Sequence, residues 1–198
     1  MRRLWLASAS PRRAQLLAVI GVHASLLPPP DIDERPLADE TPLAYVTRLA
    51  AAKARVGWAG LSAEQHPQAA VLGADTAVVL GGRILGKPSD QAEARAMLAG
   101  LSGREHRVLS AVTVITADGE SAEVSDTLVR FATLSAADID RYVASGEPMD
   151  KAGSYAVQGF AAVFVEQISG SYSGVVGLPL AETGRLLRQA GVGIWQTR

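Results

Sequence analysis

The sequence predicts an α/β or α+β protein built on a mixed β-sheet. Runs rich in β-branched residues, of the kind that form sheet strands, occur along the chain between segments with helix start and stop signals. The two kinds of segment follow no strict alternating repeat, so an all-parallel sheet is not expected. The chain has 198 residues, 48% of them hydrophobic, which is enough for a full core in one domain or in two closely joined lobes.

The first elements are expected to be a strand, a tight turn and a helix. Residues 3–7 form the apolar strand, and the helix covers residues 11–20. Ser10 occupies the N-cap position of this helix, Pro11 lies in its first turn and Gly21 follows its end, as is typical of helix boundaries.

A second strand at residues 23–27 leads into the loop of residues 28–40, which is rich in proline and acid. Thr41 and Pro42 repeat the cap-then-proline signal and open a helix that reaches about residue 59. If the protein has two lobes, the crease between them is expected near this loop and near residues 86–90.

Between residues 69 and 85, two strand runs are separated by Gly81 and Gly82, which predicts a hairpin. The same signals of capping and β-branched residues predict the elements of the second half. In chain order these are a helix from 89 or 90 to about 100, strands at 106–116 and 121–134, a helix at 135–146, a strand at 161–169 and a helix at 179–190.

Composition excludes several classes of protein. The net charge of −1 creates no overall field for nucleic acid or a membrane surface, so any bound anion must be held by local groups. The absence of cysteine excludes disulfides, thiol catalysis and cysteine-ligated zinc. No stretch approaches the ~18 apolar residues of a membrane span. The basic start "MRRLWLA" is interrupted by serines before a signal-peptide core could form, so a cytoplasmic location is expected.

Common hydrolase motifs are missing or broken. The three histidines have no ligand spacing, and no G-x-S-x-G elbow supports a Ser-His-Asp hydrolase. The segment "GGRILGKP" matches G-x-x-x-x-G-K, but Pro88 replaces the Ser or Thr that binds magnesium and has no N–H for a phosphate. We therefore reject a P-loop. Lys87 remains as a cation at the end of a strand, with simple solvent exposure as the alternative.

Two arginines at the start of a helix are the first sign of an anion site. In "LASASPRR", Arg12 and Arg13 fall in the first turn, where the helix dipole disfavours each cation by roughly 0.3–1 kcal/mol. An anion docked on the free N–H groups would reverse this effect, and guanidinium groups suit phosphate oxygens. Ser8 and Ser10 lie beside this expected anion site. The alternative is that both arginines are solvated and pair with acids elsewhere.

The helix of residues 42–59 carries a lysine on its apolar side. At 100° per residue from Leu43, Lys53 falls at about 280°, within an arc from about 220° to 340°. The apolar members of this arc are Val46, Leu49, Ala50 and Val56. Such a lysine either extends its amine to solvent or faces a partly dry pocket that holds an anion, and spacing favours neither.

Four carboxylates are candidates for site chemistry. Asp31, Asp33 and Glu34 lie in the proline-rich loop, and Asp75 follows a strand in "LGADT". An acid at a strand end among small residues has room to bind a metal or orient a water molecule. We expect Asp31 and Asp33 to be only solvated. Spacing alone does not show that Glu34 or Asp75 has a different role.

Together these features resemble the Maf family of nucleoside triphosphate pyrophosphatases over nearly the whole chain. The opening "SASPRR" matches the S-x-S-P-R-R signature of that family. Its other site positions coincide with Glu34, Lys53, "GADT" at 73–76 and Lys87-Pro88. The segments "DKAGSYAVQG" and "GSYSGVVGLPL" look like its C-terminal signatures, and no matched site position departs from the pattern.

The resemblance implies an inosine-triphosphatase-like α/β fold over residues 1–198, with a long mixed sheet flanked by helices and two lobes around a central cleft. It also implies house-cleaning hydrolysis of a nucleoside triphosphate to the monophosphate and pyrophosphate, with a divalent metal. Gln158, together with Arg12 and Thr76, is similar to the branch that acts on dTTP and UTP, including modified uridine triphosphates. Family members are commonly dimers, so a homodimer is an option, and neither nucleic acid nor a membrane is an expected partner.

The resemblance assigns roles that agree with the charges. The residues expected to bind substrate are Ser8, Ser10, Arg12, Arg13, Thr76 and Gln158, and the catalytic residues are Asp75, Lys53, Lys87 and Glu34. Asp75 is cast as general base, and Glu34 with Asp75 as ligands of Mg²⁺, or alternatively Mn²⁺. Two alternatives stay open. One is action on 7-methyl-GTP or another modified nucleotide, and the other is a non-catalytic, nucleotide-binding regulator of cell division.

Overall fold

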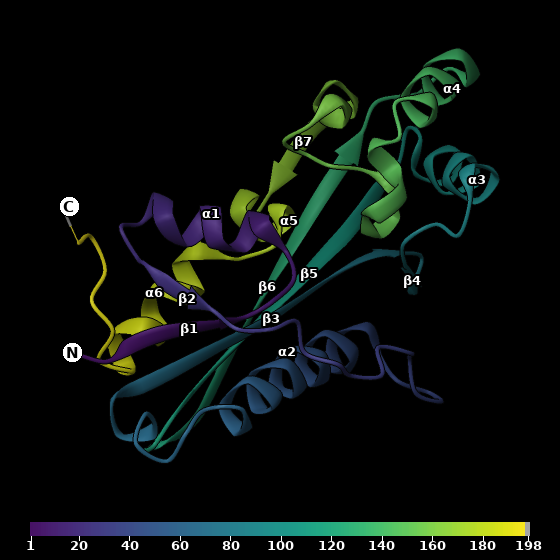
Figure 1. Ribbon diagram of the computed structural model, residues 1–198. Helices are drawn as coiled ribbons and strands as arrows, with labels where there is room; N and C mark the ends of the chain where they lie inside the picture. Colours follow the sequence, from purple (N-terminus) through teal and green to yellow (C-terminus); the bar gives the residue numbers. More distant parts are fainter. Residues whose placement is uncertain (197–198) are drawn as a thin grey trace.

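A seven-stranded sheet forms the centre of the protein in the computed structural model, which describes residues 1–196 (Figure 1). The last two residues of the expected domain 1–198 lie outside the described residues. The strands are ordered as β2 (Ala24–Leu26), β1 (Arg3–Ala7), β3 (Ala69–Leu80), β5 (Glu105–Thr116), β6 (Gly119–Phe131) and β7 (Val165–Ser169), with β4 (Arg83–Leu85) paired to β3. β1 runs parallel to β2 and β3, and the other pairs are antiparallel, which confirms the expected mixed sheet.

Helices flank this sheet, as expected. The α-helices are α1 (Pro11–Val19), α2 (Pro42–Ala59), α3 (Gln91–Leu101), α4 (Ala136–Ala144), α5 (Tyr172–Val176) and α6 (Leu180–Gln189). Short 3₁₀ turns are η1 (His66–Gln68), η2 (Glu147–Asp150), η3 (Ala152–Ser154) and η4 (Phe160–Phe164). Among residues 1–196, no helix is both long and apolar enough to cross a membrane.

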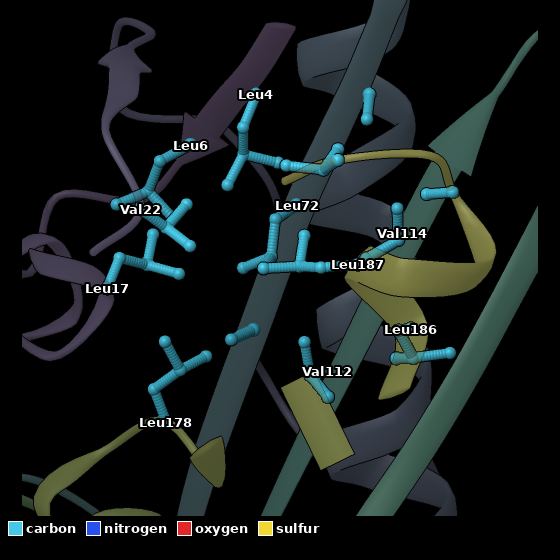
Figure 2. Packing of buried hydrophobic residues seen from close by; sticks show 14 residues of the cluster. Leu4, Leu6, Leu17, Val22, Leu72, Val112, Val114, Leu178, Leu186 and Leu187 are labelled. Carbon is cyan, nitrogen blue, oxygen red and sulfur yellow. The ribbon is translucent and has the colours of Figure 1, made fainter. Parts of the chain in front are cut away.

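The two faces of the sheet are covered differently, because successive side chains of a strand point to opposite faces. On one face, α2 packs its apolar side against Ala77, Val79 and Leu109. On the other face, α1 and α6 cover one end of the sheet, where Leu72 and Val112 meet their leucines (Figure 2). Helices α3 and α4 cover the opposite end of that face in a separate cluster. The core is therefore divided into clusters that share the long strands.

Strand β3 changes its neighbour along one side. β1 pairs with it as far as Gly73, and β4 pairs with it from Val78 onward. Within the described chain, residues 74–77 have only β5 as a partner strand. Asp75 and Thr76 lie in this gap and, as consecutive strand residues, point to opposite faces of the sheet.

Gly73 brings α2 into direct contact with the backbone of β3. A Cβ atom at this position would overlap the carbonyl oxygen of Ala50 and would lie 2.5 Å from the amide nitrogen of Ala54. Only glycine permits such a close approach of helix to strand. The contact places Lys53, one residue before Ala54, beside Asp75.

Most expected helix starts are confirmed. The side chains of Thr41, Asp90 and Ser135 each accept the amide of the third residue after them, at 2.8–3.2 Å. Ser10 holds the N-cap position of α1, but its side chain makes no capping bond. Its own amide instead donates to Oγ of Ser8 at 3.1 Å, so this turn is organised by Ser8.

Three expectations were wrong in detail. The strand expected at 161–169 begins only at Val165, because the amides of Phe160 and Ala161 donate to the carboxylate of Glu147 and residues before Val165 form η4. Helix α5 was not expected, since its sequence is interrupted by glycine. In α2, Val56 lies at the edge of the expected apolar arc and is 43% exposed.

Candidate active site

A cleft of about 630 Å³ opens at the gap beside β3. Segments distant in the chain line it, including the start of α1, the loop before α2, the end of β4 and the turns after α4. All ten residues expected to bind substrate or take part in catalysis line this cleft, namely Ser8, Ser10, Arg12, Arg13, Glu34, Lys53, Asp75, Thr76, Lys87 and Gln158. Both segments expected at the crease, 28–40 and 86–90, contribute to it.

Arg13 is a fixed part of the cleft wall. Its Nε donates to the carbonyl of Gly177 at 2.9 Å, and a terminal nitrogen donates to Oγ of Ser8 at 3.0 Å. The side chain is buried, and burial lowers the pKa of Arg13, against the attraction of Asp75. Among residues 1–196 neither Arg13 nor Arg12 forms a salt bridge. The alternative that both arginines are solvated and pair with acids elsewhere is therefore wrong.

Lys53 joins two carboxylates from different segments. Its Nζ lies 2.7 Å from Oε1 of Glu34 and 2.7 Å from Oδ1 of Asp75. Lys53 is 7% exposed, so the alternative of an amine extended to bulk solvent is wrong. A buried cation shared by two acids keeps both carboxylates facing the cleft.

The two carboxylates are tuned in opposite directions. Burial raises the pKa of Asp75, although the positive charges of Lys53 and Arg13 act against this shift. Burial also tends to raise the pKa of Glu34, but the hydrogen bond and charge of Lys53 outweigh it, so the pKa of Glu34 is lowered. Of the two, Asp75 is thus the stronger base, which suits the removal of a proton from water.

Thr76 points to the other face of the sheet and binds a second group of residues. Its Oγ1 lies 2.8 Å from Oγ of Ser110 on β5, which donates to the carbonyl of Gly174 at 2.6 Å. The Thr76 hydroxyl also lies 3.5 Å from the carbonyl of Gly177, the residue that accepts from Arg13. This network ties β3 and β5 to the segment after β7.

Lys87 and Gln158 complete the expected set on more open parts of the cleft. Lys87 follows β4 and is exposed, but its charge contributes to the lowered pKa of Glu34. Gln158 is exposed at the cleft, and its side chain makes no hydrogen bond to residues 1–196. Its amide is therefore available to a ligand.

Asp31 and Asp33 stay outside the cleft, as expected. Asp33 binds Arg35 through both carboxylate oxygens, at 2.9 Å and 2.6 Å. Arg35 itself lines the cleft. Its ion pair with Asp33 lies on the surface, and such a pair contributes little to stability.

Sequence reasoning missed Tyr45, which lines the cleft from α2. Its hydroxyl donates to the carbonyl of Glu34 at 3.0 Å, so it holds the proline-rich loop against the helix. Burial and the charges of Asp75 and Glu34 raise the pKa of Tyr45 to about 12. No spacing signal singles out this residue, because the contact depends on how a loop without secondary structure folds back.

The carboxylates of Glu34 and Asp75 fit a hard divalent cation. One oxygen of each binds Lys53, and the other accepts no hydrogen bond from the described residues. One or two carboxylates completed by substrate phosphates are the ligand set that Mg²⁺ prefers. Residues 1–196 contain no group of three His, Cys, Asp or Glu side chains that could hold a metal without such help.

Comparisons with known proteins place the chain in a family. The model of the Maf-like protein family matches residues 3–190. The dTTP/UTP pyrophosphatases of Shewanella sp. (strain MR-7) and Ralstonia nicotianae are 55% and 54% identical to the chain, over 96% of its length and 98% and 94% of theirs. A solved nucleoside-triphosphatase (dITP/XTP pyrophosphatase) from Mycobacterium abscessus is 18% identical, with a TM-score of 0.41 over 95% of this chain and 94% of its own.

Proposed function

Because the chain belongs to the Maf-like protein family, we propose that it is a nucleoside triphosphate pyrophosphatase that hydrolyses dTTP and UTP to the monophosphate and pyrophosphate. One observation on the structure supports this proposal independently of the relatives. Four cations from three separate segments line a single cleft together with Asp75, namely Arg12 and Arg13 at the start of α1, Lys53 on α2 and Lys87 after β4. A nucleoside triphosphate is a polyanion that matches such a set.

The cations and the start of α1 bind and orient the phosphates. Guanidinium forks suit phosphate oxygens, and the free amides at a helix start favour an anion in front of them. Ser8 and Ser10 add hydroxyl groups at the same turn, while Thr76 adds one from β3. Phosphoryl transfer needs little covalent help beyond positioning and charge neutralisation, and these residues supply both.

Asp75 takes a proton from the attacking water. The water oxygen forms a new bond to phosphorus while the P–O bond between the α and β phosphates breaks, which gives a nucleoside monophosphate and pyrophosphate. The raised pKa of Asp75 makes it a better base than an ordinary aspartate. Lys53 keeps the carboxylate facing the phosphates and neutralises charge on them.

A divalent cation, Mg²⁺ or alternatively Mn²⁺, is the expected cofactor, held by Glu34 and Asp75 with the phosphates. When bound, it would neutralise charge on the phosphate oxygens. The donor set described above supports this assignment.

Gln158 is the residue proposed to recognise the base. Its amide offers one donor and one acceptor to a pyrimidine edge. An amide can turn over, so this geometry alone does not exclude cytosine, and the preference for thymine and uracil rests on relatives at 50–55% identity. Modified uridine triphosphates fall within the same class.

The test is pyrophosphate release from a panel of nucleoside triphosphates, including 7-methyl-GTP, with and without magnesium. We expect dTTP and UTP to be cleaved fastest and only with the metal. Faster cleavage of 7-methyl-GTP would show a modified-purine enzyme instead.

Asp75→Asn separates an enzyme from a regulator that only binds nucleotide. The amide keeps the shape of the carboxylate but cannot accept the proton, so turnover should fall by about 100-fold or more while dTTP binding survives. Calorimetry of dTTP binding and a pyrophosphate assay measure the two effects. A wild-type protein that binds dTTP without turnover would favour the regulator.

Location and assembly extend the same proposal. We expect a cytoplasmic protein that acts on small-molecule nucleotides, without nucleic acid or membrane partners, and a homodimer is one option for its assembly. Light scattering on the purified protein and fractionation of cells that express it measure these properties.

A further inference from the structure

The segment that carries Gln158 has almost no regular structure of its own. It lies between η3 and η4, where the backbone bonds are limited to short turns such as the Gly159 amide to the Ala156 carbonyl at 2.9 Å. The Gln158 side chain has no hydrogen bond to the described residues. Its position at the cleft must therefore come from whatever holds the flanking backbone.

One carboxylate holds that backbone on its C-terminal side. Glu147 accepts the amide of Phe160 at 3.0 Å with Oε2 and the amide of Ala161 at 3.4 Å with Oε1. Gly159 packs so closely on this carboxylate that a Cβ atom there would overlap it. The contact thus begins one residue after Gln158.

Tyr142 holds the backbone on the N-terminal side of Gln158 and also binds Glu147. The Tyr142 hydroxyl donates to Oε1 of Glu147 at 2.9 Å and accepts the amide of Ala156 at 3.3 Å. Tyr142 is 5% exposed, and burial raises its pKa, so the hydroxyl remains a donor. Bonds to an ionised acceptor are roughly twice as strong as neutral ones, which makes Glu147 the central member of this group.

We propose that Glu147, supported by Tyr142, is a positioning residue that holds residues 156–161 so that Gln158 meets the nucleobase. This inference rests on the proposed function, since it assumes that Gln158 reads the base. Glu147 itself does not line the cleft and acts only through the backbone. The chemistry at Asp75 lies on β3 and does not depend on these contacts.

The deciding experiment is a double-mutant cycle of Glu147→Gln and Gln158→Ala on kcat/KM for dTTP. Each single variant should lower kcat/KM about tenfold, mainly through KM, and the double variant should be no slower than Gln158→Ala alone. Glu166→Gln, an exposed glutamate on β7, is the matched control and should match wild type. Multiplicative losses, or a Glu147→Gln enzyme as fast as wild type, would overturn the proposal.

Inorganic tripolyphosphate separates positioning of the base from general damage. It probes only the cationic part of the cleft, so its inhibition constant should be the same in wild type and in Glu147→Gln. Weakened inhibition in step with the KM for dTTP would mean that the whole site is disturbed, which contradicts the proposal. If Glu147→Gln does not fold, Tyr142→Phe removes both hydrogen bonds of the Tyr142 hydroxyl and should cost about threefold in kcat/KM.

Amide hydrogen exchange tests the contact without turnover. The amides of Phe160 and Ala161 should exchange faster in Glu147→Gln than in wild type, and unchanged rates would overturn the proposal. If wild type releases no pyrophosphate from any nucleotide, the proposed function fails, while the exchange rates still decide whether Glu147 holds this segment.

Discussion

Nζ of Lys53 lies 2.7 Å from Oδ1 of Asp75, and each side chain is only 9% exposed. Helix α2 supplies the cation and strand β3 the carboxylate, so the pair links the two elements that form one wall of the cleft. A buried ion pair of this kind is costly to form and more costly to break, because the remaining charge is left without its partner. The pair therefore fixes the carboxylate proposed as the general base, and it makes this part of the protein sensitive to substitution.

Lys53→Met keeps the length of the side chain and removes its charge. Asp75 and Glu34 would then face each other without the shared cation, and unfolding by denaturant should show a loss of about 3 kcal/mol. Turnover of dTTP should fall at the same time, because the phosphates lose a cation. Unchanged stability and rate would mean that the pair has neither role.

Arg13→Ala removes a guanidinium that binds both Ser8 and Gly177. We expect kcat/KM for dTTP to fall about 100-fold, with a higher KM as well as a lower kcat, because a fixed charge contact to the phosphates is lost. Arg141→Ala on α4, whose side chain is 82% exposed, serves as the matched control. Kinetics equal to those of this control would show that Arg13 does not meet the substrate.

The pH dependence of turnover should report on Asp75. Burial raises its pKa above the ordinary value of 3.8, and a general base must be deprotonated. The rate should therefore fall as the pH drops through the raised value, at a higher pH than an ordinary aspartate would give. A pH profile of kcat/KM for dTTP measures this, and an acidic limb at the ordinary value would contradict it.

The same shift has a consequence for stability. The folded state holds the proton of Asp75 more tightly than the unfolded state, so the residue favours folding most when it is protonated. That contribution is lost as the pH rises from the ordinary value to the raised one. The difference in free energy of unfolding between wild type and Asp75→Asn, measured with denaturant, should therefore change in disfavour of wild type as the pH rises across this range, because the other carboxylates titrate in both proteins.

Gly73→Ala should damage both stability and activity. The added methyl group would push α2 away from β3 and move Lys53 from Asp75, with a loss of about 1–3 kcal/mol in unfolding. Gly100→Ala in α3 is the matched control, because its Cβ would meet only Leu80, at an ordinary 3.6 Å. There, the better helix propensity of alanine should stabilise the protein by up to about 1 kcal/mol.

Local patterns were sufficient for the elements whose signals lie in adjacent residues. The cap residues Thr41, Asp90 and Ser135 and the hairpin at Gly81 are examples, since a cap or a tight turn depends on a few neighbouring positions. The strand expected at 161–169 failed for the opposite reason. Its first residues give their amides to Glu147, a partner that no local pattern reveals.

The candidate site shows the same limit. The helical spacing marked Lys53 as unusual but could not say whether it was buried, because that depends on β3 and on the loop that carries Glu34. The resemblance to a known family predicted which residues belong to the site. Tyr45 and Ser110 could be identified only from their contacts in the folded structure. Residues that act by holding loops have no characteristic spacing and are the hardest to predict.

The lengths of β1 and β4 determine the gap beside β3 in which Asp75, the proposed general base, lies. β1 has five residues and β4 has three, and both lie along the same side of a twelve-residue strand without meeting. Two more paired residues at the inner end of β1 would extend the ladder to Asp75 and halve the four-residue gap. Insertions and deletions should therefore abolish activity at the inner ends of these two strands, which border the gap at Ala7 and Leu85. At the outer ends, away from the gap, they should be tolerated, whichever side chains they introduce.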